Sequence, residues 1–519
     1  MAPTTCAPNL GVCDKCHARV PATHAIRGDK VYLSKSCPKC GTTEGLVSND
    51  AKTWQRKREI WQYDPATATA KMCHLNCDAC KHPRSPRLVF LDLTNRCNMN
   101  CPICVANAPW MGFDFHPPLA YFQNVFKALA AWTPRPVVHL FGGEPTMRDD
   151  LLEIIDIAHG LGLRVHLVTN GLKLADEAYC KAICDKKVPV FLGFDGRDPE
   201  IYERLRKTSA CYAPKMRALE NLKKFSLQRQ TVIMCTVARH INDQAMADLL
   251  QMSYEHRSHI KALNFLPLTE TWEPGRFEAD IATTIEDVQQ IVAGCFPDER
   301  VEFVSLGLQH HFDRALSFLR AGAAQTFQGV HPNCEAATVF LSDGQRYRPL
   351  SHYLKRPLPD IAADAVDLAK SLAPKLARFN NKGGWQRFRG KLIVLRSLLR
   401  FMRQNVRTDR IMRGSPFLGT LRVLGGMLLG KSLGQQFNKH TALGERLTSI
   451  ILPFEENHSV ESERLEMCGA GFAYEDPDTG VVSSIPACTW WFYNIPILKK
   501  IAAKYGAPSP KEELAGAKA

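Results

Sequence analysis

The stretch LDLTNRCNMNCPIC, residues 91–104, decides how this chain of 519 residues is interpreted. An apolar run leads into three cysteines, Cys97, Cys101 and Cys104, in the spacing C-x3-C-x2-C. Three thiolates so spaced can hold one [4Fe–4S] cluster and leave its fourth iron without a protein ligand. That iron can then bind a small molecule and pass it an electron. Taken alone, the triplet is also compatible with a zinc site or an ordinary ferredoxin-type cluster.

A second motif, VVHLFGGEPT at residues 137–146, is an apolar run that ends in Gly142, Gly143, Glu144 and Pro145. Together the two motifs resemble the radical S-adenosylmethionine (SAM) superfamily. The resemblance implies that the triplet binds the cluster and that the GGEP turn receives the methionine end of SAM. Backbone atoms of the two glycines and the glutamate would contact its amino group, because glycine permits a close approach.

The resemblance implies an enzyme with a [4Fe–4S] cluster and SAM as cofactors. In this superfamily one electron from the cluster splits SAM into methionine and a 5′-deoxyadenosyl radical, which abstracts hydrogen from an unactivated carbon. An electron donor such as a ferredoxin or flavodoxin would be a partner. Ile103 precedes the third cysteine, where the superfamily often has an aromatic residue against adenine, and an apolar side chain can take that role.

Further SAM contacts are expected where strands end. Thr169 and Asn170 end the third apolar run of the series described below, and Asp195 follows the fourth. We expect these three side chains to meet the ribose or the carboxylate of SAM. Helix capping and turn formation are the alternative roles of such residues.

Short β-rich runs alternate with amphipathic helical stretches between residues 87 and 270, which predicts a parallel sheet covered by helices. The runs are RLVFLDL (87–93), VVHLF (137–141), RVHLVT (164–169), VPVFLGF (188–194), TVIMCTV (231–237) and LNFLPL (263–268). Six such units fit the partial (β/α)6 TIM barrel that the resemblance implies. The overall expectation is an α/β fold with this barrel, a small N-terminal metal-knuckle module with four cysteines, and a helix-rich C-terminal region that carries auxiliary-cluster cysteines. Both motifs lie at the carboxyl ends of their strands, where such barrels place catalytic loops.

Two further groups of cysteines precede the barrel. Cys13, Cys16, Cys37 and Cys40 form two C-x2-C pairs, the spacing of a tetrahedral site for Zn or mononuclear Fe. Cys73, Cys77 and Cys80 repeat the x3/x2 spacing. No GGEP follows this triplet directly, so we interpret it as the site of an auxiliary [4Fe–4S] cluster, with a second zinc knuckle as the alternative.

Composition limits the cellular location and the binding partners that we expect for the protein. Eleven of the nineteen cysteines lie before residue 105, and no export signal is visible, which favours metal ligands over disulfides. No apolar run approaches the length of a membrane-spanning helix. We therefore expect a cytoplasmic protein, with a peripheral contact with the inner face of the cell membrane left open. The net charge of +14 indicates an anionic partner or a well-solvated basic surface. The sequence contains no recognisable RNA-binding motif, so we do not expect a nucleic acid as a partner.

The pattern changes to helix-rich, basic sequence after about residue 310. Within residues 385–412, Leu392, Leu395, Leu399, Met402 and Val406 share one side of an expected helix, beside an arginine stripe. Such a helix either lies on an anionic membrane or covers a core. The expected division is 1–55 (four-cysteine zinc-ribbon or rubredoxin-like module), 56–86 (auxiliary-cluster segment), 87–310 (radical SAM core), 311–460 (helical, basic region), 461–505 (C-terminal cysteine segment) and 506–519 (tail).

A narrower resemblance rests on CHLNCDAC (73–80), LTNRCNMNCPICVANA (93–108), GFDGRDPEIYERLR (193–206), TVARHINDQ (236–244) and LNFLPLTETWEPGRF (263–277). These segments are similar to a branch that includes archaeal tetraether lipid synthase and the radical SAM methyltransferases of methanopterin biosynthesis. The resemblance implies that Cys334, Cys468 and Cys488 complete one or two auxiliary clusters.

Four functions follow as hypotheses. The first is modification of a lipid hydrocarbon chain, by C–C bond formation or a related reaction. The second is radical methylation of a pterin-like or other small substrate, and the third is peptide maturation. The non-enzymatic alternative is an iron–sulfur scaffold, against which the intact GGEPT segment argues.

Overall fold

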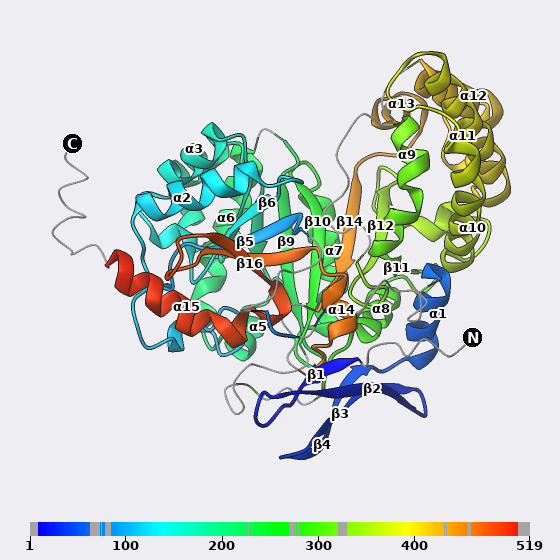
Figure 1. Ribbon diagram of the computed structural model, residues 1–519. Coiled ribbons are helices and arrows are strands. Elements are labelled where there is room, and N and C mark those ends of the chain that lie inside the picture. Colours follow the sequence, from blue (N-terminus) through cyan, green and yellow to red (C-terminus); the bar gives the residue numbers. More distant parts are fainter. Residues whose placement is uncertain are drawn as a thin grey trace.

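A sheet of mainly parallel strands forms the centre of the computed structural model (Figure 1). The structure describes residues 9–62, 73, 75–77, 85–226, 228–268, 277, 281–319, 330–429, 431, 433–453 and 458–506. The six expected strands are present and lie side by side, all parallel. They are β5 (Leu88–Asp92), β6 (Val137–Phe141), β7 (Arg164–Thr169), β8 (Val190–Gly193), β9 (Thr231–Val237) and β10 (Ile260–Pro267). The expected α/β fold with a partial barrel is therefore confirmed.

Helices connect successive strands and cover the outer face of the sheet (Figure 1). They are α2 (Leu119–Ala131), α3 (Leu151–Gly160), α4 (Glu177–Asp185), α5 (Pro199–Arg206), α6 (Tyr212–Phe225), α7 (Met246–Glu255) and α8 (Ile285–Gly294). Side chains alternate between the two faces of each strand. In β6, Val138 and Leu140 are fully buried in the main hydrophobic core, whereas His139 and Phe141 line an internal cavity. The same strand thus builds both the core and the site.

Two segments from the C-terminal third extend the parallel sheet at both edges. Strand β14 (Arg446–Ile451) pairs parallel with β10, and β15 (Ala470–Glu475) pairs parallel with β5. Antiparallel strands follow outside them: β12 (Ala336–Ser342) beside β14, then β11 (Val304–Ser305) and β13 (Tyr347–Pro349), and β16 (Val482–Pro486) beside β15. The turn DPDTG, residues 476–480, joins β15 to β16 in the expected hairpin. The barrel is therefore not closed, and regions expected to be helical or cysteine-bearing also supply strands.

A separate antiparallel sheet precedes the barrel and lies at the bottom of Figure 1. It consists of β1 (Leu10–Val12), β2 (Arg19–Arg27), β3 (Lys30–Cys37) and β4 (Gly41–Ser48), followed by α1 (Ala51–Trp61). Asp50 caps α1 by accepting a hydrogen bond from the Thr53 backbone N–H at 2.9 Å. The buried side chains of Lys57 on α1 and Glu286 on α8 form an ion pair at 2.5 Å. This pair links the N-terminal module to the barrel.

A lobe of helices lies beside the barrel, at the upper right of Figure 1. It contains α9 (Asp313–Leu319), α10 (Leu358–Leu376), α11 (Gly384–Asn405), α12 (Pro416–Leu428) and α13 (Leu433–His440). The apolar stripe of α11 packs inward: Leu395, Leu399 and Met402 share a cluster with Val423 and Leu424 of α12. For this stripe the core-covering interpretation therefore holds. Among the described residues, no helix is long and apolar enough to cross a membrane.

The last helices among the described residues are α14 (Ser462–Glu466) and α15 (Trp490–Tyr505). Helix α15 packs on the hairpin, where the Trp490 and Phe472 rings stack with their centroids 5.1 Å apart. Phe472 also stacks on Phe90 of β5 at 5.1 Å. The expected tail, residues 506–519, lies outside the described residues apart from Gly506.

We predict that Phe472→Ala lowers the free energy of unfolding by about 3–5 kcal/mol, because it removes a fully buried ring shared by β5, β15 and α15. Val481→Ala is the matched control, since Val481 at the hairpin tip is 60% exposed. Urea unfolding followed by tryptophan fluorescence measures both variants. Equal stability of the two variants would mean that β15 contributes little to the core.

Candidate active site

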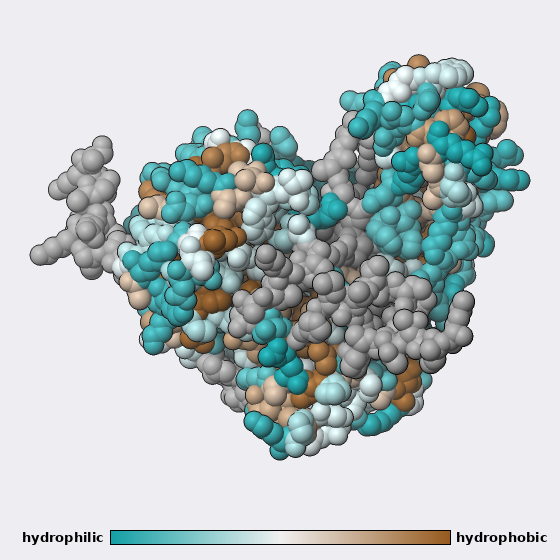
Figure 2. All heavy atoms as spheres, in the orientation of Figure 1, coloured by the Kyte–Doolittle hydropathy of each residue, from teal (hydrophilic) through white to brown (hydrophobic). Residues whose placement is uncertain are grey.

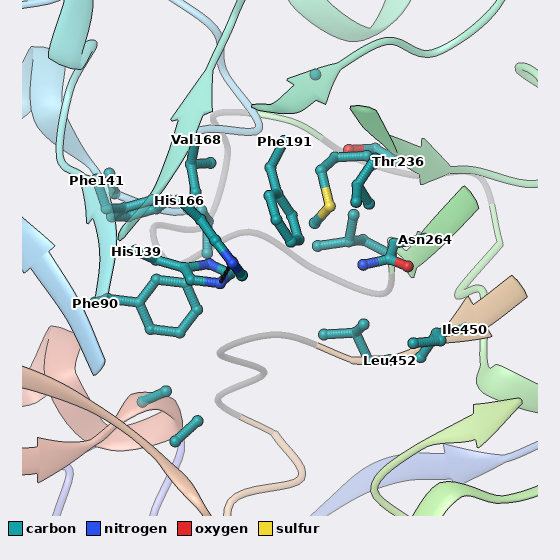
Figure 3. Close-up of a pocket in the computed structure, with 18 of the residues that line it drawn as sticks. Phe90, His139, Phe141, His166, Val168, Phe191, Thr236, Asn264, Ile450 and Leu452 are labelled. Carbon is teal, nitrogen blue, oxygen red and sulfur yellow. Dashed lines mark hydrogen bonds between the residues drawn. The ribbon is translucent and has the colours of Figure 1, made fainter. Parts of the chain in front are cut away.

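The barrel encloses a cavity of about 760 Å³ that extends from the amino-terminal to the carboxyl-terminal ends of the strands. Thr448 and Ile450 of β14 line it together with Ala470 of β15, so the open sheet curves around it from both edges. Most of the wall is apolar or aromatic. The labelled residues of Figure 3 point into this space and are Phe90, His139, Phe141, His166, Val168, Phe191, Thr236, Asn264, Ile450 and Leu452.

The cysteine loop forms one end of the cavity. Cys97, Cys101 and Cys104 follow β5 at its carboxyl-terminal end, and all three line the cavity. The side chain of Asn95 shapes the loop: it accepts a hydrogen bond from the Phe115 N–H at 2.8 Å and donates one to the Phe113 carbonyl at 2.5 Å. These contacts close the long loop back onto its own start.

The three thiols fit a cluster better than a single metal ion. Their sulfurs do not all lie within 4.8 Å of one another, as ligands of one ion would. A four-iron cluster binds each thiolate on a separate iron and so spreads its ligands. Burial and the nearby Glu144 carboxylate raise the pKa of the Cys97 thiol to about 12. A metal centre bound to this sulfur would favour its thiolate form.

The GGEP turn packs directly against the cysteine loop. The Gly143 N–H donates to the Thr94 carbonyl at 2.7 Å, and the Glu144 N–H donates to the Arg96 carbonyl at 2.9 Å. A Cβ at Gly142 would clash with the Thr94 oxygen, and one at Gly143 with the Arg96 oxygen. Gly142 also has a φ of 126°, which side-chain-bearing residues rarely adopt. The glycines are therefore needed for loop packing, in addition to any contact with SAM.

The Glu144 side chain joins the ends of β6 and β7. It is 1% exposed, and its carboxylate accepts hydrogen bonds from the Thr169 hydroxyl and the Asn170 N–H, both at 2.7 Å. The Asn170 side chain donates to Asn98 of the cysteine loop at 2.7 Å. Glu144, Thr169 and Asn170 all line the cavity beside the cysteines. Pro145 begins a buried 3₁₀ turn behind them.

Asp195 is placed differently from the expectation. It is fully buried and does not line the cavity; its carboxylate accepts hydrogen bonds from Arg206 at 3.0 and 3.1 Å. Arg206 lines the cavity next to Cys101. Burial opposes its charge, but Asp195 holds the pKa of Arg206 above its ordinary value. The cation that faces the cavity is thus Arg206, which sequence reasoning missed although it lies within GFDGRDPEIYERLR.

Lys215 is a second buried cation that sequence reasoning missed. Its ammonium group donates to the carbonyls of Asn170 and Gly193 at 2.5 and 2.6 Å, and so it joins the ends of β7 and β8. It lines the same cavity as Arg206. No sequence signal distinguished it from the other lysines of α6.

Polar groups also lie midway along the cavity. His139 and His166 on neighbouring strands form a hydrogen bond of 2.9 Å between Nε2 and Nδ1, and their rings point into the cavity (Figure 3). Burial lowers the pKa of His166 to about 3 and that of His139 well below its ordinary value, so both are neutral at physiological pH. The buried Asn264 Oδ1 has no hydrogen-bond partner among the described residues. In the sequence, His139, His166 and Asn264 are each a polar residue within a mostly apolar strand, and this pattern could have identified them as cavity residues.

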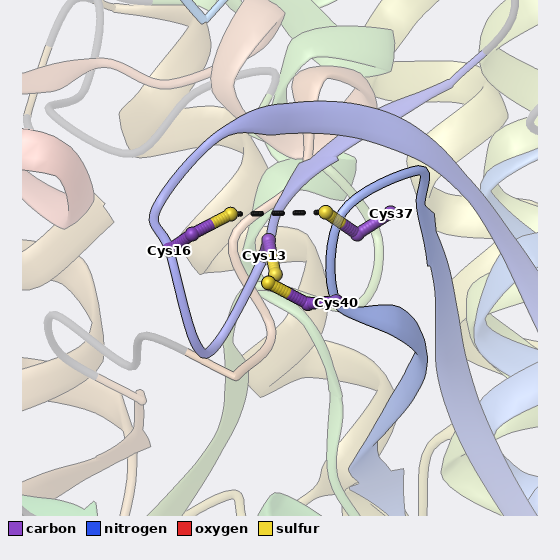
Figure 4. Close-up of side chains that lie close together, drawn as sticks. All are labelled: Cys13, Cys16, Cys37 and Cys40. Carbon is purple, nitrogen blue, oxygen red and sulfur yellow. Dashed lines mark hydrogen bonds between the residues drawn. The ribbon is translucent and has the colours of Figure 1, made fainter.

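The N-terminal cysteines converge as expected. The sulfurs of Cys13, Cys16, Cys37 and Cys40 all lie within 4.8 Å of one another (Figure 4). The Cys16 and Cys37 sulfurs are 3.7 Å apart. Four sulfurs at this spacing fit one tetrahedral ion and leave it no open position.

Three of the remaining cysteine candidates line the cavity, and two others are buried. Cys334, Cys468 and Cys488 line the same cavity as the Cys97 triplet. Cys73 and Cys77 are buried, and the Cys77 sulfur accepts a hydrogen bond from the Thr489 hydroxyl at 3.2 Å, one residue after Cys488. Cys80 lies outside the described residues.

Comparison with known proteins agrees with this geometry. Residues 91–252 match the radical SAM superfamily, and residues 10–49 match the HMPTM N-terminal zinc ribbon domain. The first match places residues 91–252 in the radical SAM superfamily, whose members are enzymes that use a [4Fe–4S] cluster and SAM. The second match favours zinc at the four N-terminal cysteines.

Several relatives match parts of the chain. It is 32% identical over 270 residues to the 7,8-dihydro-6-hydroxymethylpterin dimethyltransferase of Methanocaldococcus jannaschii. This alignment covers 50% of this chain and 53% of the relative. It is 31% identical over 159 residues to the AdoMet-dependent heme synthase of Oleidesulfovibrio alaskensis, covering 30% and 39%. Streptococcus suis SuiB aligns with a TM-score of 0.33 at 12% identity, covering 52% of this chain and 66% of SuiB. The chain spans about half or less of these curated relatives.

We predict that Gly142→Ala abolishes most SAM cleavage. The added Cβ would clash with the Thr94 backbone oxygen and displace the cysteine loop, and alanine rarely adopts the φ of 126° that Gly142 has. Gly160→Ala at the end of α3 is the matched control, with open space around the added Cβ. Iron content and 5′-deoxyadenosine formation are measured after anaerobic reconstitution. Full iron content and activity in the Gly142 variant would contradict the packing role.

Proposed function

We propose that this radical SAM enzyme modifies an unactivated carbon of a lipid hydrocarbon chain, by C–C bond formation or a related reaction. The observation that carries the proposal is the mostly apolar wall between the cysteine loop and the basic amino-terminal end of the cavity. Val168, Met234, Leu266 and Ile450 lie on four different strands, Leu452 directly follows β14, and all five line the cavity. Such a wall favours a hydrocarbon and excludes water from the reacting carbon.

The residues at the cysteine end have separate roles in this proposal. Cys97, Cys101 and Cys104 hold the [4Fe–4S] cluster, and the backbone of Gly142, Gly143 and Glu144 faces the SAM amino group. When bound, the cluster and SAM supply the radical that takes hydrogen from carbon. Arg206 is the cation that would receive the SAM carboxylate, and Asp195 positions it.

Thr169, Asn170 and Ile103 complete the proposed SAM pocket. Thr169 and Asn170 line the cavity while their hydroxyl and backbone N–H bind Glu144, so they are held rigidly beside the turn. Ile103 is 9% exposed and packs with Leu205 and Leu268 in one cluster. Its apolar side chain would contact adenine, in keeping with the role expected of it.

Auxiliary metal centres form a second part of the proposal. Cys334, Cys468 and Cys488 face the cavity, and Cys73, Cys77 and Cys80 belong to the preceding triplet. We assign these six cysteines to one or two auxiliary [4Fe–4S] clusters. The Cys334 sulfur accepts a hydrogen bond from the Arg464 guanidinium at 3.4 Å, and such a contact would stabilise a thiolate ligand.

A second candidate function is radical methylation of a pterin-like substrate. The specific observation in its favour is the Asn264 amide, whose oxygen lacks a partner among the described residues and faces the cavity opposite His139 and His166 (Figure 3). Aromatic rings of Phe90 and Phe191 lie beside the histidines. An amide and aromatic rings suit a flat heterocycle, and one relative is named a pterin dimethyltransferase.

We propose that the helical lobe contacts the anionic inner face of the cell membrane. Residues 384–440 contain twelve lysines and arginines and a single acidic residue, Asp409. Among the described residues, the large apolar side chains exposed on this lobe are Trp385, Phe388, Phe417, Leu418, Leu421 and Leu429. These exposed side chains are not part of the apolar stripe of α11, which packs inward. Figure 2 shows the lobe as largely hydrophilic with hydrophobic residues interspersed. Basic and apolar side chains together suit a lipid interface.

We predict that cells expressing the protein anaerobically contain a lipid species with fewer hydrogens or an added methyl group, and that Cys97→Ala removes it. The triplet would lose one of its three cluster ligands. Cys295→Ala is the matched control, because Cys295 lies at the end of α8 and does not line the cavity. Mass spectrometry of whole lipid extracts makes the comparison. Identical profiles in cells that contain the native lipids of the protein would favour the pterin-like substrate.

We also predict that the purified protein sediments with vesicles of phosphatidylglycerol and phosphatidylcholine, and that about 0.5 M salt releases it, since salt screens exposed charges. The double variant Trp385→Ser/Phe417→Ser should bind roughly tenfold more weakly, because it removes two exposed apolar contacts. Val481→Ser removes an exposed apolar side chain outside the lobe and should bind normally. Binding to neutral vesicles with equal affinity would exclude the electrostatic contact.

A further inference from the structure

We propose that the amino-terminal end of the cavity is an anion-binding subsite, in which Lys261, Arg446 and Arg229 hold the phosphate or carboxylate of an amphipathic substrate. The chain of that substrate would extend from the subsite toward Cys97. The inference deepens the proposed lipid function and rests on it for the identity of the substrate.

The three cations lie at or near the starts of three neighbouring strands. Lys261 is the second residue of β10 and Arg446 the first of β14, and Arg229 lies two residues before β9. Because β9, β10 and β14 are adjacent and parallel, these residues gather at the amino-terminal end of the sheet. All three line the cavity whose other end is the cysteine loop.

A β-bulge presents Lys261 at this position. Ile260 pairs with Thr231 and Ala262 pairs with Val232, so Lys261 is an extra residue in β10 without a partner in β9. A bulge re-aims the side chain of the extra residue, and here it allows both Lys261 and Ala262 to line the cavity. Strict alternation would place adjacent residues on opposite faces.

The charge of Lys261 is not neutralised within the described residues. Its ammonium group has no hydrogen bond or ion pair there, and the residue is half-buried. Burial and the nearby Arg229 lower its pKa, and no carboxylate contributes to the shift. A half-buried ammonium group without a counter-ion gains stability from an anionic ligand.

Arg229 and Arg446 have different positions in the subsite. The Arg229 guanidinium donates to the carbonyls of Arg257, Ile260 and Arg446 at 2.7, 2.5 and 2.8 Å, which fixes the strand ends and keeps its positive charge in place. Arg446 is exposed at the mouth of this end.

Acidic side chains of the cavity wall lie at the opposite end. Glu144 belongs to the GGEP turn, and Glu335 precedes β12, which runs antiparallel to β14 and so begins near the carboxyl-terminal end of that strand. Glu445, which directly precedes Arg446, forms an ion pair with Arg257 at 3.5 Å. Among the described residues, the two acids of the cavity lining thus lie at the cysteine end together with the cations Arg206 and Lys215, whereas the charged residues that line the amino-terminal end are all basic.

The length of the cavity favours an extended ligand. Lys261 and Leu268 both line it and are seven residues apart along β10 and its end. At about 3.3 Å per residue, this separation is roughly 23 Å. An extended chain would reach from the cysteine loop to Lys261, whereas a flat heterocycle at Asn264 would span only the middle of the cavity.

The test is ligand binding to the full-length protein, which does not require SAM cleavage. Affinities of dodecyl phosphate, dodecanol and inorganic phosphate are measured by calorimetry below the aggregation concentration of each amphiphile. The wild type should bind dodecyl phosphate at least about tenfold more tightly than dodecanol, since the phosphate adds a charge-assisted contact. Lys261→Met should lose this preference without weakening dodecanol binding.

Two controls separate the charge of Lys261 from the stability of the fold. Lys261→Arg should retain the preference, and Lys181→Met, on the outer face of α4, should leave it unchanged. An equal preference in Lys261→Met and the wild type would overturn the proposal. Phosphate binding that depends on Lys261 without binding of either amphiphile would also overturn it, in favour of a site for a small anion.

The binding experiment and the lipid comparison fail independently. If cellular lipids are unchanged but the preference for dodecyl phosphate depends on Lys261, the subsite stands and the substrate is another anionic amphiphile. If a lipid product forms while Lys261→Met binds normally, the proposed function stands and the subsite does not.

Discussion

The hydrogen-bonded seam between the cysteine loop and the GGEP turn is the constraint on which the site depends. Backbone bonds from Gly143 and Glu144 to the loop hold three thiols at the carboxyl end of β5. The buried Glu144 carboxylate then extends the seam to β7 through Thr169 and Asn170. Each partner is a backbone group or a short side chain, so the seam has little freedom to move. A metal centre and its small-molecule ligand need such fixed geometry, because catalysis is sensitive to small displacements.

Strand alternation lets one sheet serve two purposes. Residues on the outer face pack against the helices, whereas those on the inner face form a cavity that is polar at both ends and mostly apolar between them. The cations Arg206 and Lys215 lie at the cysteine end, and Lys261 lies at the other. The proposed functions therefore depend on how a ligand is oriented along the barrel, with its reactive carbon near the cysteines and its remaining groups near the histidines or the basic end.

Much of the fold was predictable from sequence, because each of the six barrel strands is a short apolar run bounded by turns. The boundaries of 137–141, 164–169 and 231–237 agree with β6, β7 and β9. The edge strands β14 and β15 were not predicted as parts of the sheet. RLTSII and AGFAYE are ordinary short segments, and their partners lie more than 180 residues away in the chain. Likewise, the position of Asp195 after a strand did not reveal that its carboxylate would bind Arg206.

The sequence by itself determined the local chemistry: two C-x2-C pairs, the Cys97 triplet and the GGEP turn, whose spacing along the chain sets which atoms can share a metal or a turn. It also determined the strand order of the central barrel, because consecutive βα units pair with their neighbours. Only the tertiary structure decided which distant groups meet. It joined the C-terminal strands to both edges, brought Cys334, Cys468 and Cys488 to the cavity, and turned Lys261 inward through a bulge. These outcomes depend on pairing register and packing across the sheet, which no local pattern encodes.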